Sequence, residues 1–228
     1  MARDDPQNPD PAFARLLASL PDAEQLEPWL SWCRQSRGPV LYLGPGAGRL
    51  LVPLAAQGIR FVGVDSHPDL IALLTQRVPG LQLHRARIEE MDLGRRFDLV
   101  IAPSHLLTSS ERINAAARHC ARALAFELLN PHWLKARAGR PMREGVEVVE
   151  FERASCRLRL EHPGGIQQEE TTGLIWPEQV EEELAASGLR LESMQALGER
   201  SGLRSASSYA VLAVRPRGRR FDRGLIPG

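Results

Sequence analysis

Hydrophobic and polar positions in the middle of the chain follow a strand–helix rhythm. Short apolar runs predict strands at residues 39–43, 59–65, 81–85, 97–103 and 123–129. Apolar positions at helical spacing predict helices between them, over about 47–57, 68–77 and 110–123. Strands that alternate with helices form βαβ units of a parallel sheet, with ligand sites at the carboxyl ends of the strands.

The rhythm changes after residue 135. Residues 156–162 (CRLRLEH) alternate apolar and charged side chains, which predicts a half-buried antiparallel strand between two others at 146–153 and 166–176. A helix then begins at Pro177 and ends at Gly188, and the patterns LRLESMQAL and SSYAVLAV predict two final strands.

The two ends of the chain have a different character from the middle. Residues 1–11 hold three prolines and three aspartates and should be disordered, and two short amphipathic helices are expected over residues 13–20 and 22–36. We therefore expect three parts, which are a disordered start with a helical cap (1–37), one α/β domain (38–215, with an antiparallel insertion or lid at 136–176) and a flexible arginine-rich tail (216–228).

Composition excludes several classes of protein. The chain has 228 residues, 43% of them hydrophobic and 25% charged, which suits one globular domain with a sizeable core. A net charge of +1 gives no global field for binding a phosphate backbone or an anionic membrane. Three distant cysteines without CxxC spacing argue against disulfides and zinc, and no signal peptide or long apolar run is visible. We expect a cytoplasmic protein without a metal site.

A glycine-rich loop, GPGAG at residues 44–48, follows the first predicted strand. Such a loop permits unusual backbone angles and lets a ligand approach main-chain N–H groups where a helix begins. Arg49 stands where a dinucleotide fingerprint needs a small residue, and no Gly-Lys-Ser/Thr follows as in a P-loop. A nucleotide-like ligand other than a dinucleotide or a triphosphate is favoured.

Four stretches in order carry a resemblance to a known family: LGPGAGR, VGVD ending at Asp65, ARIEEMDL and FDLVIAP. With the two final strands, residues 38–215 resemble the class I (Rossmann-like) S-adenosylmethionine-dependent methyltransferases. The resemblance implies an α/β fold with a seven-stranded, mostly parallel sheet, helices on both faces, N-terminal helices and a small antiparallel insertion. It also implies S-adenosylmethionine as cofactor.

The resemblance places the cofactor site on residues at strand ends, which are Tyr42, Gly44, Pro45, Gly46, Gly48, Asp65, Ser66, Arg87, Ile88 and Pro103. Asp65 lies 19 residues after Gly46, where a carboxylate can accept hydrogen bonds from two ribose hydroxyls or cap the following helix. Tyr42 and Arg87 depart from the family, many members of which carry an acid at the first position and an aspartate at the second.

Candidates for the acceptor pocket are His105, Glu127 and His132, any of which could act as a general base. The four tryptophans are possible pocket walls, although core packing suits each of them as well. The leading hypothesis is methyl transfer to an O or N atom of a small-molecule acceptor, with no nucleic acid or membrane as partner. Two alternatives stay open, a nucleic-acid methyltransferase and a methyltransferase-like binding subunit that has lost catalysis.

Overall fold

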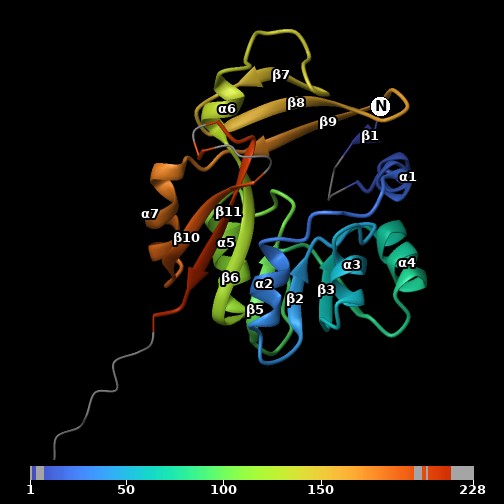
Figure 1. Cartoon of the computed structure of the whole chain (residues 1–228), viewed down its shortest axis with the longest axis vertical. Coiled ribbons are helices and arrows are strands. Elements are labelled where there is room, and N and C mark those ends of the chain that lie inside the picture. The colour runs from blue at the N-terminus through green and yellow to red at the C-terminus, as the bar shows by residue number, and fades with distance from the viewer. Residues whose placement is uncertain (1, 4–7, 198–201, 204, 217–228) are drawn as a thin grey trace, which may run out of the picture.

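The computed structural model describes residues 2–3, 8–197, 202–203 and 205–216 (Figure 1). A large sheet with its helices forms one part of the molecule, and a smaller sheet lies above it in the view of Figure 1. Most of the arginine-rich tail, residues 217–228, lies outside the described residues.

The large sheet has seven strands in the order β10-β11-β6-β5-β2-β3-β4. Their bounds are β2 Val40–Leu43, β3 Phe61–Asp65, β4 Gln82–Arg85, β5 Phe97–Ala102, β6 Cys120–Leu129, β10 Arg190–Leu197 and β11 Ser208–Val214. All neighbouring pairs are parallel except those of β11, which runs antiparallel to both β6 and β10. The predicted seven-stranded, mostly parallel sheet is confirmed.

Helices cover both faces of this sheet because successive residues of a strand point to opposite sides. Leu41 and Leu43 pack with side chains of α5 and α7, whereas Val40 and Tyr42 pack with those of α2, α3 and α4. The helices are α1 Pro11–Ser19, α2 Trp29–Arg34, α3 Leu51–Ala56, α4 Pro68–Arg77, α5 Ser110–Arg118, α6 Pro131–Lys135 and α7 Val180–Ala186, the last preceded by the 3₁₀ turn Pro177–Gln179.

The second sheet has the order β1-β9-β8-β7. Its strands are β1 Ala2–Arg3, β7 Val146–Phe151, β8 Ser155–His162 and β9 Ile166–Gly173. Cys156 and Leu158 of β8 are buried in a small cluster with Leu134 of α6, while Arg157 and Arg159 form ion pairs with glutamates of the neighbouring strands. The predicted antiparallel insertion with one apolar face is therefore present over β7 to β9.

The first two residues that are described differ from their prediction. Ala2 and Arg3 were expected to be disordered but pair with Gln168 and Glu169 of β9 in parallel, and Ala2 is buried. Helix α1 begins already at Pro11, where the Asp10 side chain accepts a hydrogen bond from the backbone N–H of Ala12. The N-terminal segment is thus attached to the second sheet, and residues 1 and 4–7 lie outside the described part.

Several helices differ from their prediction. Residues 22–28 are not helical, and α3 begins at Leu51 instead of about residue 47 because left-handed glycines occupy the turn before it. Helix α5 ends at Arg118, since Cys120 and the residues after it pair with β5. The short helix α6 was missed; Asn130 caps it by accepting from the His132 N–H, and Pro131 starts it.

Candidate functional site

A cavity of about 940 Å³ lies at the carboxyl ends of the central strands. Residues after β2, β3, β4 and β5, together with Glu127 of β6, form its floor and walls. Pockets that enclose small molecules typically measure roughly 300–1,000 Å³. The cavity therefore has room for a nucleoside-sized cofactor and a second small molecule.

The glycine loop forms one wall through its backbone. Gly44, Gly46 and Gly48 all have positive φ, at 63°, 56° and 85°, which side chains rarely adopt. A Cβ on Gly44 would stand 2.1 Å from Cδ1 of Leu106, so this glycine also allows the two loops to approach. Gly44, Pro45 and Gly46 line the cavity, whereas Gly48 packs against Leu74 of α4 and does not.

Asp65 at the end of β3 is held by backbone donors on both oxygens. Its Oδ2 accepts from the N–H of Gly46 and its Oδ1 from the N–H of His67, each at 2.9 Å. Burial raises the pKa of Asp65, and these hydrogen bonds oppose that rise. The carboxylate and its neighbour Ser66 both line the cavity. This geometry positions the start of α4 and presents an acid to the cavity at the same time.

Tyr42 of β2 is buried and also lines the cavity. Its ring packs edge-on against Phe61, with centroids 5.8 Å apart, and burial raises the pKa of its hydroxyl. Within the described part of the chain, this hydroxyl makes no hydrogen bond. Tyr42 therefore packs as a core aromatic and keeps a neutral polar group beside the glycine loop.

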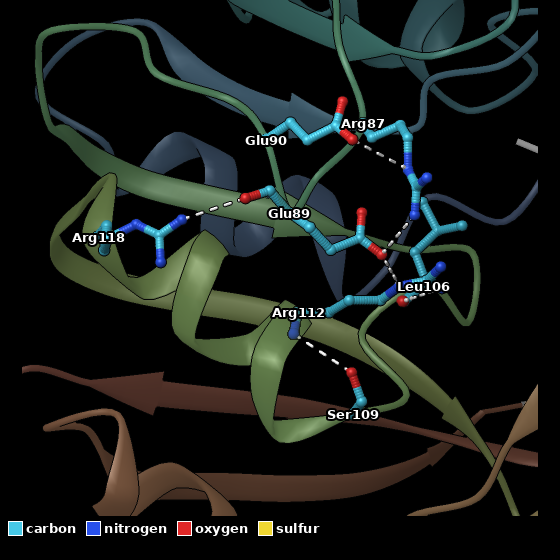
Figure 2. Close-up of polar contacts among 7 residues, drawn as sticks. All are labelled: Arg87, Glu89, Glu90, Leu106, Ser109, Arg112 and Arg118. Atoms are coloured by element: carbon cyan, nitrogen blue, oxygen red, sulfur yellow. Dashed lines mark hydrogen bonds and ion pairs between the residues drawn. The ribbon is translucent and has the colours of Figure 1, made fainter. Parts of the chain in front are cut away.

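An ion-pair network after β4 was not anticipated (Figure 2). The Glu89 carboxylate lies between two arginines, with Nε of Arg112 at 2.7 Å and Nη2 of Arg87 at 3.7 Å. Burial would raise the pKa of Glu89, but its hydrogen bonds and the charge of Arg112 outweigh that effect and lower it. Arg112 also donates to the carbonyl of Leu106. The network joins the loop of Arg87 and Ile88, both of which line the cavity, to the loop after β5.

A histidine and a glutamate meet in the wall of the cavity. Nε2 of His105, in the loop after Pro103 and Ser104, lies 2.9 Å from Oε1 of Glu127 on β6. His105 has a positive φ of 54°, a backbone conformation that is uncommon for a residue with a side chain. Burial alone would lower the pKa of His105, but the carboxylates of Glu127 and Glu170 outweigh it and raise the pKa.

His132 does not reach this cavity. It lies at the start of α6, where its ring packs edge-on against Trp176 and its Nε2 lies 3.5 Å from Glu178. Its expected place in the acceptor pocket is therefore wrong. Among the tryptophans, Trp29 lines the cavity, whereas Trp32 packs against Trp29 and Trp133 lies under the guanidinium of Arg137.

Two segments that are distant in sequence cover the cavity. Residues of α1, including Phe13 and Leu17, lie on one side, and Gln168, Glu170 and the end of β9 lie on the other. The pairing of β1 with β9 connects them, and His67 joins the first of them to the floor through a 3.0 Å hydrogen bond between Nε2 and the Asp10 carbonyl. Contacts of this kind leave no local signal in the sequence.

Two absences concern the described residues only. No group of three or more His, Cys, Asp or Glu side chains in that part of the chain is placed to hold a metal ion. None of its helices is long and apolar enough to cross a membrane.

Comparison with known proteins identifies the class of this fold. Residues 40–126 match the family model described as a methyltransferase domain. No curated protein sequence matches the chain significantly. Residues 40–126 therefore form a methyltransferase domain, and the chain has the fold of the class I S-adenosylmethionine-dependent methyltransferases.

Solved structures resemble the chain over almost its whole length. An S-adenosylmethionine-dependent methyltransferase from Clostridium acetobutylicum ATCC 824 is 14% identical, with a TM-score of 0.66 and coverage of 90% of this chain and 98% of that one. CalS10, an amino pentose methyltransferase from Micromonospora echinaspora with bound cofactor, is 20% identical with a TM-score of 0.61, covering 90% of both chains. The glycopeptide N-methyltransferase MtfA is 17% identical with a TM-score of 0.62, covering 92% and 99%.

The match of residues 40–126 to a methyltransferase domain agrees with the predicted class of enzyme, and the similar structure CalS10 was solved with S-adenosylmethionine bound. The structure itself fits that cofactor, because two left-handed glycines, Gly44 and Gly46, and a buried acid meet at a cavity of sufficient size.

Proposed function

We propose that this protein transfers the methyl group of S-adenosylmethionine to the nitrogen of an amine on a small molecule. The single observation that carries this proposal is the pair of His105 and Glu127 in the cavity wall, at 2.9 Å. Of the O and N acceptors that the sequence left open, this pair favours nitrogen.

Charge on the acceptor side of the cavity supports an amine. Glu127 and Glu170 both line the cavity near His105, and the charges of both carboxylates raise the pKa of His105. An ammonium group is attracted to such carboxylates, whereas an alcohol gains much less from them. The amine must then lose its proton before its lone pair can attack.

His105 is the group that we assign to this proton transfer. As a neutral imidazole it accepts the proton of the ammonium, and Glu127 stabilises the imidazolium that forms, as acid–histidine pairs do elsewhere. Bound S-adenosylmethionine supplies an electrophilic methyl group on a sulfonium. The protein's contribution is to bind and orient the two molecules and to hold this proton at the imidazole.

The cofactor half of the proposed site is made by the glycine loop, Asp65 and the loop of Arg87 and Ile88. We assign Asp65 to the ribose hydroxyls and Ile88 to one face of the adenine. Arg87 is engaged with Glu89 and Glu90. In this proposal Arg87 therefore supports the loop instead of contacting the base.

A small acceptor suits the cover formed by α1 and β9. The named acceptors of two similar structures are an amino pentose and a glycopeptide, the latter methylated on nitrogen, which supports the same class of acceptor here. The nucleic-acid alternative depended on the arginine-rich tail, of which residues 217–228 lie outside the described residues, and on Arg85 and Arg87, of which Arg87 pairs with Glu89 and Glu90.

The test uses the full chain, S-adenosylmethionine labelled on its methyl group, and matched pairs of acceptors. Each pair holds an amino sugar and the parent sugar with a hydroxyl at the same carbon. We expect label in the amino sugar and none in its partner. Equal transfer to both, or transfer to RNA but not to any amine, would contradict the proposal. The Asp65→Ala variant serves as the control for background transfer.

A further inference from the structure

Arg49 forms no ion pair with any residue that the structure describes. Among the described residues, three arginines line the cavity, which are Arg49, Arg87 and Arg112. Arg87 and Arg112 both pair with Glu89, as Figure 2 shows. No carboxylate of the described chain lies within ion-pair distance of Arg49.

The position of Arg49 is well defined despite this missing partner. Its Nε donates to the carbonyl of Pro21 at 2.7 Å, and its own carbonyl accepts from the N–H of Ala23 at 2.8 Å. These two bonds fix the orientation of the guanidinium. The two terminal nitrogens of Arg49 remain available, in the fork that matches a carboxylate.

The segment to which Arg49 is hydrogen-bonded adds neutral residues to the cavity wall. Residues 21–29 contribute Ala23, Gln25 and Trp29 to the wall, and Tyr42 presents a hydroxyl there. Burial raises the pKa of this hydroxyl, the charges of Glu127 and Asp65 add to the rise, and the charge of Arg49 opposes it. Tyrosine at position 42 adds no negative charge to this part of the wall, whereas an acid would.

Arg49 and the proposed adenosine contacts lie at different ends of the cofactor half. Strand β2, which carries Tyr42 and the glycine loop, lies between β3 with Asp65 and β5 with the loop of His105. Arg87 and Ile88 follow β4, at the edge of the sheet beyond β3. A ligand whose adenosine lies at Asp65 and Ile88 therefore brings its other end to β2.

We propose that Arg49 binds the α-carboxylate at the methionine end of the cofactor, through its two terminal nitrogens. This assignment rests on the proposed function. In the sequence, Arg49 served only as evidence against a dinucleotide-binding site, and this assignment gives it a contact with the cofactor. Arg49 thereby also selects cofactors that keep their amino-acid end.

The test compares two ligands that differ in this end. S-adenosylhomocysteine contains the amino acid, and 5′-methylthioadenosine lacks it. Calorimetry on the full chain should show that Arg49→Gln weakens binding of the first by about 10-fold or more, the loss of a charged hydrogen-bonded pair. Binding of the second should change by less than about 2-fold, because no contact to it is removed.

Two further variants separate this role from a structural one. Arg77 does not line the cavity but anchors the same segment, through an ion pair to Asp22 at 2.7 Å and a bond to the Ala47 carbonyl at 2.6 Å. If Arg49 acted only by holding residues 21–23, Arg77→Gln would reproduce its effect. Arg49→Lys keeps the charge but loses the fork, so we expect an intermediate loss for S-adenosylhomocysteine alone.

The outcomes are distinct. Equal weakening of both ligands by Arg49→Gln, or no weakening of either, overturns the assignment while the parent protein still binds. The same selective loss in Arg77→Gln also overturns it. If the parent protein binds neither ligand at millimolar concentration, the proposed function falls, and this assignment falls with it.

Discussion

Asp65 and Glu127 are both carboxylates at strand ends in one cavity, yet their partners differ. Asp65 accepts hydrogen bonds from two backbone N–H groups, which cannot titrate. Glu127 faces the imidazole of His105, which can gain and lose a proton near neutral pH. Two carboxylates in one cavity thus have different surroundings, with fixed backbone donors at Asp65 and a titratable imidazole at Glu127.

This difference divides the cavity into a binding half and a chemical half. Around Asp65 the wall is formed by Gly44, Gly46 and the loop before α4, which carry few side-chain polar groups besides Asp65 itself. Around Glu127 side chains from β6, β9 and the loop after β5 supply it. Substitutions in the first half should therefore change affinity and stability, and those in the second should change the rate and its dependence on pH.

The largest effect is expected from Asp65→Ala. The variant leaves the N–H groups of Gly46 and His67 without their acceptor and removes the proposed ribose contact. We expect the dissociation constant for S-adenosylhomocysteine to rise by about 100-fold and the free energy of unfolding to fall by about 2 kcal/mol. Calorimetry and urea unfolding measure the two quantities.

Asp69→Ala is the matched control, since Asp69 lies exposed in the first turn of α4 and outside the cavity wall. It should leave the affinity unchanged. An Asp65→Ala variant that binds the ligand as tightly as the parent would end the ribose assignment.

A smaller effect, on rate instead of affinity, is expected from Glu127→Gln. General-base catalysis typically contributes about 10²–10⁴-fold, so weakening the base should lower kcat by about 10- to 100-fold. Because Glu127 raises the pKa of His105, its removal should lower that pKa. The fall in rate on the acid side should then begin at a lower pH than in the parent. Rates measured from pH 5.5 to 9 test both effects.

The chain contains a second histidine–glutamate pair that serves as control. His132 and Glu178 lie 3.5 Å apart but outside the cavity wall. Glu178→Gln should therefore alter neither kcat nor the pH profile. A Glu127→Gln variant whose profile stays in place would remove His105 from the proton transfer.

The smallest effect is expected from Tyr42→Phe. The hydroxyl has no partner within the described chain, so its loss should change the free energy of unfolding by no more than about 0.5 kcal/mol. Tyr209 offers the contrast, because its buried hydroxyl donates to the Ile175 carbonyl at 2.7 Å. Tyr209→Phe should cost about 1–2 kcal/mol in urea unfolding. A comparable cost for Tyr42→Phe would show a hydrogen bond that the hydroxyl must make.

Much of the binding half could be predicted from the sequence because its signals are local. Strand β2, the three glycines and Asp65 lie within 26 consecutive residues, and each makes its contribution through backbone geometry or through a fixed place at a strand end. All three glycines have positive φ, as expected for a loop that needs backbone angles open mainly to glycine. Only the start of α3 was misplaced, since the turn before it is longer than the apolar pattern suggests.

The chemical half could be predicted only as a set of candidates. His105 and Glu127 were proposed from their places after strands, but the sequence gave no reason to pair them or to separate them from His132. Pairing depends on the neighbouring positions of β5 and β6 and on the positive φ of His105. The bond of Glu89 to Arg112, 23 residues away, likewise follows from the docking of two loops.

The sequence by itself indicated the alternating α/β fold, because hydrophobic period acts over a few residues, and its motifs indicated the seven-stranded sheet and a methyltransferase through their resemblance to a family. Tertiary structure alone decided the cover of the cavity by α1 and β9, the separation of His132 from His105, and the lack of an ion pair to Arg49 among the described residues. These features depend on which distant segments pack together, and packing between elements is not encoded in any short pattern of the chain.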